Sequence, residues 1–247
     1  MSGSPTGMTT HSGSSAERLL AFLKSRTFFG GLPDAALEAL IRRVHIKNFS
    51  KGEIVCRRGD PGDSLMVIVS GRIKIANVNA DAKEVVLNFL GAGDVNGEIA
   101  VLDGGERSAN AIALEDSEVL VIYGRDLMPA LSTHPQAMLE IIQILCERLR
   151  SVSAIIEDSA LAMRGRAAKG LLRLAQQHGR TSKDGVRIQL MLSQDDLGKY
   201  LGLSRANVSR QLGQLKLVNV IKIEGSQVVI TDEKGLAEIA ESASTND

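Results

Sequence analysis

The chain has 247 residues, of which 44% are hydrophobic, and it balances 29 lysines and arginines against 29 aspartates and glutamates. That length allows one large or two modest domains with a buried core. The neutral total hides an asymmetry, because residues 160–230 contain twelve basic and four acidic residues. Two cysteines are too few for a disulfide framework, and no apolar run reaches the roughly 20 residues of a membrane helix. The composition predicts a cytoplasmic protein, without a membrane segment, whose second half is basic.

The first half of the chain changes from helical to strand-like patterns. Residues 1–16 are rich in serine, glycine and threonine and are expected to form a disordered leader. Apolar residues then recur at helical spacing in residues 16–29 and 33–44, which predicts two short helices. From residue 46 to 123, short runs rich in valine and isoleucine are separated by Gly-Asp turns such as Gly59-Asp60. Many short strands with regularly spaced turns predict an antiparallel β-roll.

Beyond Pro135 the helical period returns. The apolar positions have a three-four spacing and are Ile142, Leu145, Leu149, Val152 and Ile156. A seam of about two heptads favours a two-stranded coiled coil, and hence a homodimer. The alternative is a helix that packs on the β-roll. We expect this helix to break near residues 163–165, where a new domain begins.

Residues 192–216, LSQDDLGKYLGLSRANVSRQLGQLK, have the layout of a helix-turn-helix. Ser193 can cap the first helix, with Asp196 three residues later in a capping-box pattern. Gly202 supplies the turn, and Ser204 can cap the second helix. One face of this second helix is apolar and consists of Val208, Leu212 and Leu215.

The opposite face of the second helix is predicted to read DNA. Small residues surround a long cation there, which suits a helix in the major groove, where an arginine pairs with guanine. The following segment, VIKIEGSQVVI, predicts two strands of a wing that touches the DNA backbone. The alternative is a helical hairpin with solvated arginines. The positions expected at DNA are Ser193, Lys199, Ser204, Arg205, Ala206, Asn207, Ser209 and Arg210.

Residues 97–109, GEIAVLDGGERSA, contain the groups that a sugar-phosphate ligand requires. A glutamate accepts hydrogen bonds from ribose hydroxyls, and an arginine holds a phosphate with two parallel donors. Backbone N–H groups can complete an anion cradle. The alternative is a structural ion pair between Glu98 and Arg107 across a hairpin. The backbone groups expected in the cradle belong to Ile99, Ala100, Ser108 and Ala109.

This segment resembles the phosphate-binding cassette of cyclic nucleotide-binding domains. Together with the predicted β-roll, the seam helix and the segment SRANVSR of the helix-turn-helix, the cassette extends the resemblance to residues 20–235. This part of the chain is similar to the bacterial transcription regulators typified by the cyclic AMP receptor protein and the fumarate-nitrate reduction regulator. The resemblance implies that Glu98 binds the ribose hydroxyl and that Arg107 and Ser108 bind the cyclic phosphate. It also implies that Gly97 and Ala109 shape the loop.

Two positions depart from the pattern of that family. The pair that contacts adenine in the cyclic AMP receptors corresponds to Val152 and Ser153, of which only Ser153 keeps a hydroxyl. In the DNA-reading helix, Ala206 replaces the glutamate of the common Arg-Glu pair. Because that glutamate can accept from a cytosine amino group, we expect a different DNA half-site.

The predicted fold is α+β: a leader at 1–16, a cyclic-nucleotide-binding β-roll at 17–135, a dimerisation helix at 136–162 and a winged helix-turn-helix at 163–240. The predicted function is a homodimeric transcription regulator with cyclic AMP or cyclic GMP as its allosteric ligand and an inverted repeat of double-stranded DNA as its target. RNA polymerase is a candidate partner through residues 178–188, for which a solvated loop is the simpler interpretation.

Other classes of protein fit the sequence less well. No catalytic motif is present, so an enzyme is not expected. No metal site is expected either, because the histidines and cysteines are scattered, and Cys146 is predicted to be a small core residue. A regulator of the same architecture that binds DNA without a nucleotide, or senses another signal, remains the alternative. A cyclic-nucleotide-controlled enzyme or channel would use the same cassette, but the chain has neither a catalytic motif nor a membrane segment.

Overall fold

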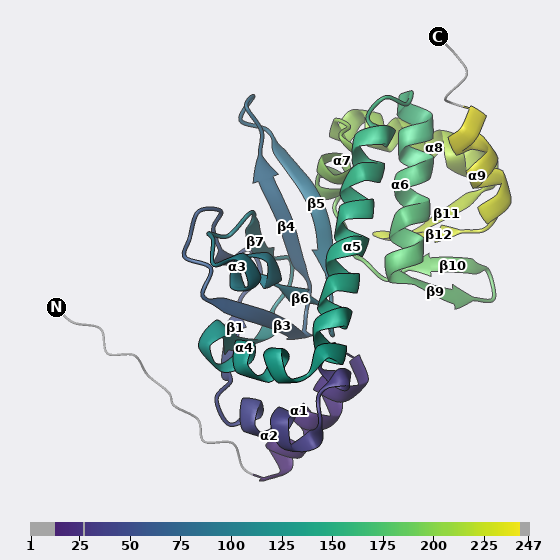
Figure 1. Cartoon of the computed structure of the whole chain (residues 1–247). Helices are drawn as coiled ribbons and strands as arrows, with labels where there is room; N and C mark the ends of the chain where they lie inside the picture. The colour runs from purple at the N-terminus through teal and green to yellow at the C-terminus, as the bar shows by residue number, and fades with distance from the viewer. Residues whose placement is uncertain (1–12, 27, 243–247) are drawn as a thin grey trace. The chain divides into compact units, whose positions relative to one another are not determined.

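The computed structural model describes residues 13–26 and 28–242 (Figure 1). Contacts divide the described chain into two compact units. The first comprises the residues up to Ile75 together with Phe89–Glu147, and the second comprises Ala76–Asn88 and the residues from Arg148 onward. Residues 1–12 of the predicted leader lie outside the described residues, and the first helix begins within that leader, at Gly13.

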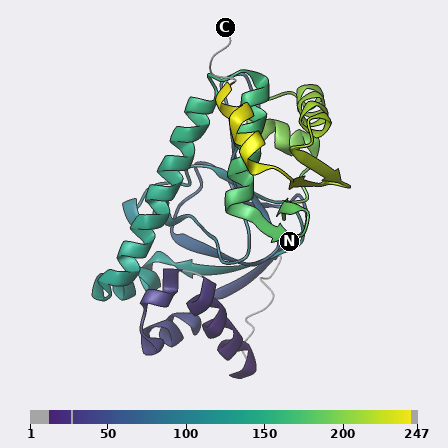
Figure 2. The same cartoon turned by 90° about the vertical axis from the view of Figure 1, so that its right-hand side faces the viewer.

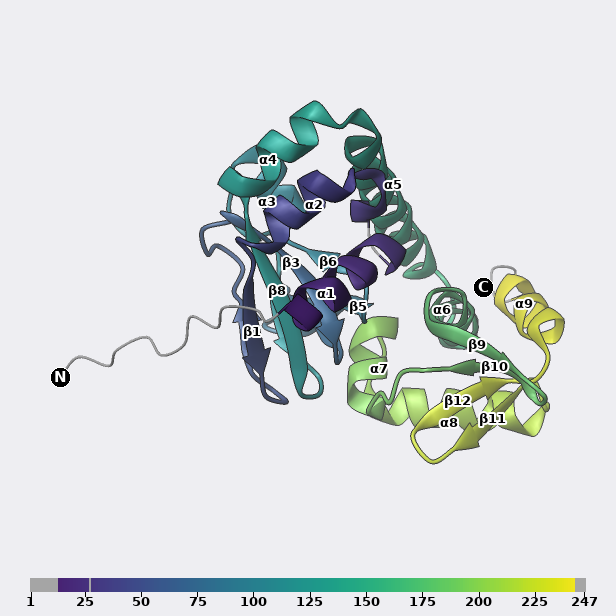
Figure 3. The same ribbon diagram turned by 90° about the horizontal axis from the view of Figure 1, so that it is seen from below.

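Helices cover one end of the first unit. They are α1 (Gly13–Arg26), the short 3-10 helix η1 (Phe28–Gly31), α2 (Asp34–Ile41) and α4 (Gly124–Thr133). Helix α2 lies between α1 and α4 (Figure 3). Phe29 and Leu37 are fully buried in a core that these helices share with Leu65 of the sheet. The two predicted N-terminal helices are thus present, and α4 is an element that the sequence pattern did not indicate.

Two four-stranded sheets make the β-roll. One has the strand order β1-β8-β3-β6 and the other β2-β7-β4-β5. The first consists of β1 (His45–Phe49), β8 (Ser117–Tyr123), β3 (Ser64–Ser70) and β6 (Val95–Asn96). The second consists of β2 (Ile54–Cys56), β7 (Asn110–Ala113), β4 (Ile73–Val78) and β5 (Glu84–Leu90). In β3, residues 64–68 are all buried, and Leu65 and Val67 lie in the core that the sheet shares with the helices. The predicted antiparallel roll is confirmed.

Helix α5 (Pro135–Asp158) has 24 residues and contributes to both units. Its seam is largely uncovered in the single chain, since Ile142, Leu149, Val152 and Ile156 are 41–68% exposed. Leu145 is half-buried against the core of the first unit. Cys146 is exposed, so its predicted place in the core is wrong. It is the residue after Leu145, and one helical step turns a side chain by about 100° away from the apolar stripe.

The second unit combines helices with one four-stranded antiparallel sheet, in the order β11-β12-β10-β9. Helix α9 packs along α6 (Figure 2). The elements are α6 (Met163–His178), β9 (Gly179–Ser182), β10 (Gly185–Ile188), α7 (Gln194–Leu201), α8 (Arg205–Leu217), β11 (Ile221–Glu224), β12 (Gln227–Ile230) and α9 (Glu233–Ser242). The predicted break after the seam helix is observed, because α5 ends at Asp158 and α6 begins at Met163.

Residues 178–188, for which a solvated loop was the simpler prediction, do not form such a loop. They contain the hairpin of β9 and β10, in which Val186 pairs with Thr181 on one side and with Ile230 of β12 on the other. The hairpin completes the sheet of the wing, so its backbone groups are satisfied by strand pairing. No described helix is both long and apolar enough to cross a membrane.

Candidate functional site

Glycines set the backbone of the segment at residues 97–109. Gly97 has φ +89° and directly precedes the short helix α3 (Glu98–Asp103). Gly104 ends that helix with φ +71°. These left-handed conformations are strained for residues that have a Cβ. At Gly62, an added Cβ would lie 2.1 Å from the Cβ of Ala100, so the loop before β3 packs directly against α3.

Arg107 is fixed at both its backbone and its side chain. Its N–H donates to the carbonyl of Asp60 at 2.9 Å, and its carbonyl accepts from the N–H of Gly59 at 2.9 Å. Its Nη2 donates to Ser64 Oγ at 2.8 Å, and its Nη1 donates to the carbonyl of Gly97 at 3.4 Å. The residue is only 4% exposed. Both of these side-chain partners are neutral groups, a hydroxyl and a backbone carbonyl.

Cys56 lies beside the same guanidinium. Burial raises the pKa of its thiol, while the charge of Arg107 acts in the opposite direction and lowers it. Asn96 Nδ2 donates to Cys56 Sγ at 3.8 Å. A thiol with a raised pKa is a poor nucleophile at neutral pH, so Cys56 acts here as a small buried side chain.

The structure brings most of the predicted ligand residues together in the first unit. Glu98 and Ala100 are each 2% exposed, while Ile99 is 39% exposed and Ser108 is exposed. Val152 and Ser153 lie on the part of α5 that belongs to the second unit, and their role at a ligand stays a prediction. Sequence reasoning missed Ser64, because nothing in a serine that opens a strand reveals a partner 43 residues away.

The helix-turn-helix forms as its sequence predicts. Ser193 Oγ accepts from the N–H of Asp196 at 3.0 Å, and Ser204 Oγ accepts from the N–H of Asn207 at 3.3 Å. Gly202 follows α7 in the left-handed conformation, with φ +65°. A Cβ on Gly198 would lie 2.6 Å from the carbonyl oxygen of Leu203, so the turn that follows α7 packs too closely on this helix for any residue but glycine.

Helix α8 has one buried and one exposed face. Val208 and Leu215 are fully buried, and Leu212 is 4% exposed. The opposite face carries the predicted DNA-reading residues, all of which are exposed: Arg205, Ala206, Ser209 and Arg210. Asn207, beside them, is half-buried. A convex helix face with two uncovered arginines and small neighbours can enter a DNA groove.

Lys199 of α7, one of the positions expected at DNA, has two acidic neighbours, Asp195 and Glu84. Its Nζ lies 2.8 Å from Asp195 Oδ2. The hydrogen bond to Asp195 raises the pKa of Lys199, and burial opposes this effect. Glu84 Oε2 lies 3.4 Å from the same Nζ, so a DNA phosphate would have to compete with both Asp195 and Glu84 for this ammonium group.

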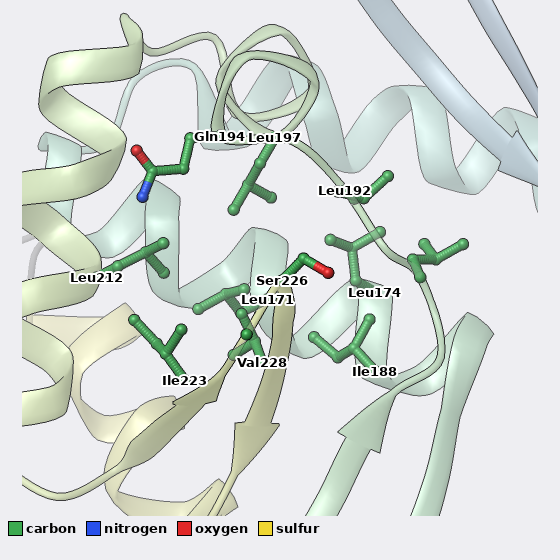
Figure 4. Close-up of a pocket in the computed structure, with 12 residues that line it drawn as sticks. Leu171, Leu174, Ile188, Leu192, Gln194, Leu197, Leu212, Ile223, Ser226 and Val228 are labelled. Atoms are coloured by element: carbon green, nitrogen blue, oxygen red, sulfur yellow. The ribbon is translucent and has the colours of Figure 1, made fainter. Parts of the chain in front are cut away.

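A small cavity lies under the wing, between α6, α7, α8 and β12 (Figure 4). Its volume is about 60 Å³, and leucines such as Leu171, Leu174 and Leu197 line it. Ligand pockets usually measure roughly 300–1,000 Å³. The cavity is too small and too apolar for a nucleotide and is best explained as imperfect packing within the second unit.

Asp158, the last residue of α5, is 4% exposed and anchors a polar cluster within the second unit. Arg173 of α6 donates from Nη1 to Asp158 Oδ2 at 2.7 Å and from Nε to the hydroxyl of Tyr200 on α7 at 2.8 Å. Lys169 Nζ lies 3.9 Å from Asp158 Oδ1. The cluster ties the end of α5 to the first two helices of the unit.

Comparisons with known proteins agree with this division of the chain. Residues 46–134 match the cyclic nucleotide-binding domain family, and residues 165–239 match the Crp-like helix-turn-helix domain family. The chain is 30% identical over 210 residues to the "CRP-like cAMP-activated global transcriptional regulator" of Mycobacterium tuberculosis. The aligned region covers 85% of this chain and 94% of that protein. The chain belongs to the CRP/FNR family of transcription regulators. It is a DNA-binding regulator with a cyclic nucleotide-binding domain, and not an enzyme.

Other similar proteins carry different names. The "Anaerobic regulatory protein" of Bacillus subtilis is 29% identical over 216 residues, covering 86% of this chain and 91% of that protein. The solved structure of FixK2 from Bradyrhizobium japonicum superposes on this chain with a TM-score of 0.70 at 22% sequence identity. The superposed region covers 79% of this chain and 96% of that one, and at this identity the likeness shows the fold alone.

No group of histidine, cysteine, aspartate and glutamate side chains that could hold a metal ion occurs among the described residues.

Proposed function

We propose that this CRP/FNR protein is a homodimeric regulator whose affinity for DNA is controlled by a cyclic nucleotide, with cyclic AMP as the preferred ligand and cyclic GMP as the second candidate. It would act on DNA in the cytoplasm. One observation carries the proposal: Arg107 is a buried cation with neutral partners, at the position where the family's cassette binds phosphate.

A guanidinium that is 4% exposed has lost most of its hydration. Burying a charge is costly unless an opposite charge compensates it. The hydroxyl of Ser64 and the carbonyl of Gly97 orient Arg107 but supply no negative charge. An anionic ligand would supply that charge, and a cyclic phosphate carries one negative charge on oxygens that can accept from an arginine.

Glu98 and Ser108 support a nucleotide over a simple anion. Both lie in the same cassette as Arg107, where a carboxylate can accept from the ribose hydroxyl and an exposed serine can donate to the phosphate. Cyclic AMP is favoured over cyclic GMP by the relative from Mycobacterium tuberculosis, whose name describes it as cAMP-activated.

The dimer is supported by the uncovered seam of α5. Leu149 and Ile156 are 68% and 66% exposed in the single chain, although they are large apolar residues at heptad spacing. Pairing this stripe with the same stripe of a second chain would remove it from water. Two copies of α8 would then face DNA with two-fold symmetry, which predicts an inverted repeat as the binding site.

Calorimetric titration tests the ligand. The wild-type protein should bind cyclic AMP more tightly than cyclic GMP. Arg107→Ala should abolish or greatly weaken binding, and Glu98→Ala should weaken it less, because the ribose hydroxyl is uncharged. Arg125→Ala is the matched control, because this arginine of the same unit is 76% exposed and lies outside the cassette. Unchanged affinity of Arg107→Ala would remove the proposed site.

DNA binding tests the output. Fluorescence anisotropy with an inverted-repeat duplex, with and without nucleotide, should show tighter binding when the nucleotide is present, since an effector acts through its differential affinity for two states. Equal DNA affinity in both conditions would favour a regulator that works without a nucleotide.

A further inference from the structure

We propose that Ser64 is a positioning residue of the ligand site, which orients the guanidinium of Arg107 toward the phosphate without neutralising it. The inference rests on the proposed binding of a cyclic nucleotide. Ser64 lies outside residues 97–109 and opens strand β3, so it belongs to a different part of the roll from the cassette that it serves.

The backbone holds Ser64 firmly. It pairs with Tyr123 in the antiparallel ladder between β3 and β8. The carbonyl of the preceding residue, Asp63, accepts from the N–H of Gly124 at 2.8 Å. Ser64 is 5% exposed, so its hydroxyl is a fixed hydrogen-bonding group within the roll.

The guanidinium is confined from two sides. Its bond to Ser64 Oγ is the shorter of its two side-chain hydrogen bonds, at 2.8 Å against 3.4 Å for the bond to Gly97. On the other side, a Cβ on Gly97 would lie 1.8 Å from Nη1. Because the backbone of Arg107 is anchored at Gly59 and Asp60, the bond to Ser64 decides where the far end of the side chain points.

The chemistry of a hydroxyl suits this task. A carboxylate at the same place would orient Arg107 equally well, but it would pair with the cation and compete with the phosphate. A serine hydroxyl accepts from Nη2 and leaves the positive charge available. An arginine that is already oriented also loses less conformational entropy when the ligand binds.

The test compares affinities for cyclic AMP by calorimetry in the full-length protein. Ser64→Ala should weaken binding roughly tenfold, because one charge-assisted hydrogen bond that orients Arg107 is lost. Ser64→Thr, which keeps the hydroxyl, should stay within roughly threefold of the wild type. Ser70→Ala, at the exposed end of the same strand, is the matched control and should bind as the wild type does. Thermal unfolding of each variant verifies its fold.

Titration with a second ligand distinguishes two effects of Ser64→Ala: a changed position of Arg107 at the phosphate, and a general disturbance of the cassette. The analogue 2′-deoxy-cyclic AMP lacks the hydroxyl that Glu98 is proposed to bind. If Ser64 acts only through Arg107, the ratio of the two affinities is the same in Ser64→Ala and in the wild type. A changed ratio would show that the substitution disturbs the whole cassette and would overturn the positioning role.

The remaining outcomes distinguish this inference from the proposed function. Wild-type protein that binds cyclic AMP, together with a Ser64→Ala variant of equal affinity, would overturn the role of Ser64 and leave the nucleotide site standing. Wild-type protein that binds neither cyclic AMP nor cyclic GMP would overturn both.

Discussion

Removing the carboxylate of Asp158 should lower the free energy of unfolding of the second unit by about 3 kcal/mol. The Asp158 and Arg173 side chains are 5% and 13% exposed, and they are joined by a hydrogen bond of 2.7 Å. Breaking one partner of such a buried pair costs roughly 3–5 kcal/mol, because the other charge stays buried without compensation. We expect the lower end of that range, because Arg173 keeps its bond to the hydroxyl of Tyr200.

Lys169 provides a matched control on the same carboxylate. Its ammonium group lies 3.9 Å from Asp158, and its side chain is 41% exposed, so water screens the interaction. Exposed pairs contribute about 0–1 kcal/mol. Lys169→Ala should therefore lower the free energy of unfolding by less than about 1 kcal/mol, although it also removes a charge from the Asp158 cluster.

The chain offers a convenient reporter for this measurement. It contains two tyrosines and no tryptophan, and one tyrosine lies in each unit. In a Tyr123→Phe background, tyrosine fluorescence during urea unfolding follows Tyr200, and hence the second unit alone. Linear extrapolation of the transition gives the free energy of unfolding of each variant.

Two results would refute the reasoning. A loss below about 1 kcal/mol for Asp158→Ala would mean that Arg173 reaches water once its partner is gone. An equal loss of unfolding free energy in Lys169→Ala would mean that distance and burial do not determine how strongly Arg173 and Lys169 interact with Asp158.

Three further predictions concern Tyr200, the dimer and the helix-turn-helix. In the Tyr123→Phe variant, absorbance titration should show Tyr200 ionising above its ordinary pKa, because burial raises the pKa of the phenol and the charge of Arg173 only partly opposes this. The stability that comes from the neutral phenol is thus fully present below the unfolded pKa of about 10 and is lost as the pH rises through the folded pKa. Val152→Asp places like charges across the proposed seam and should give a monomer in sedimentation equilibrium, whereas a stable dimer would contradict the seam. Arg210→Ala should cost roughly 1–3 kcal/mol on the cognate duplex and relax one guanine preference, while Lys199→Ala should weaken binding to cognate and scrambled duplexes alike. Equal losses on both duplexes for Arg210→Ala would rule out base reading by this side chain.

Local patterns in the sequence were sufficient for the helix-turn-helix. Caps, turn glycines and helical periodicity act over three to four residues, and these short-range rules placed Ser193, Gly202 and Ser204 correctly. The β-roll was predictable for the same reason, because strands such as Glu84–Leu90 and Ser117–Tyr123 are rich in β-branched residues and are bounded by turns.

Elements whose identity depends on distant partners were missed. The hairpin at Gly179–Ile188 is short and polar, and it becomes part of a sheet only because β12 pairs with β10. Cys146 was assigned to the core because its helix is apolar, but exposure depends on which face of α5 the rest of the chain covers.

In the cassette at residues 97–109, too, the sequence predicted the chemical groups but not their surroundings. The segment GEIAVLDGGERSA contains the residue types that bind a sugar phosphate, and its resemblance to the cassette of cyclic nucleotide-binding domains implied a ligand of that class. That Arg107 is buried with neutral partners was decided by the tertiary structure, through Ser64 on another strand. Sequence determines which groups a site can contain, because side-chain chemistry is local. Burial and orientation depend on segments that meet only when the chain folds, so the burial of Arg107 beside neutral partners became visible only in the structure.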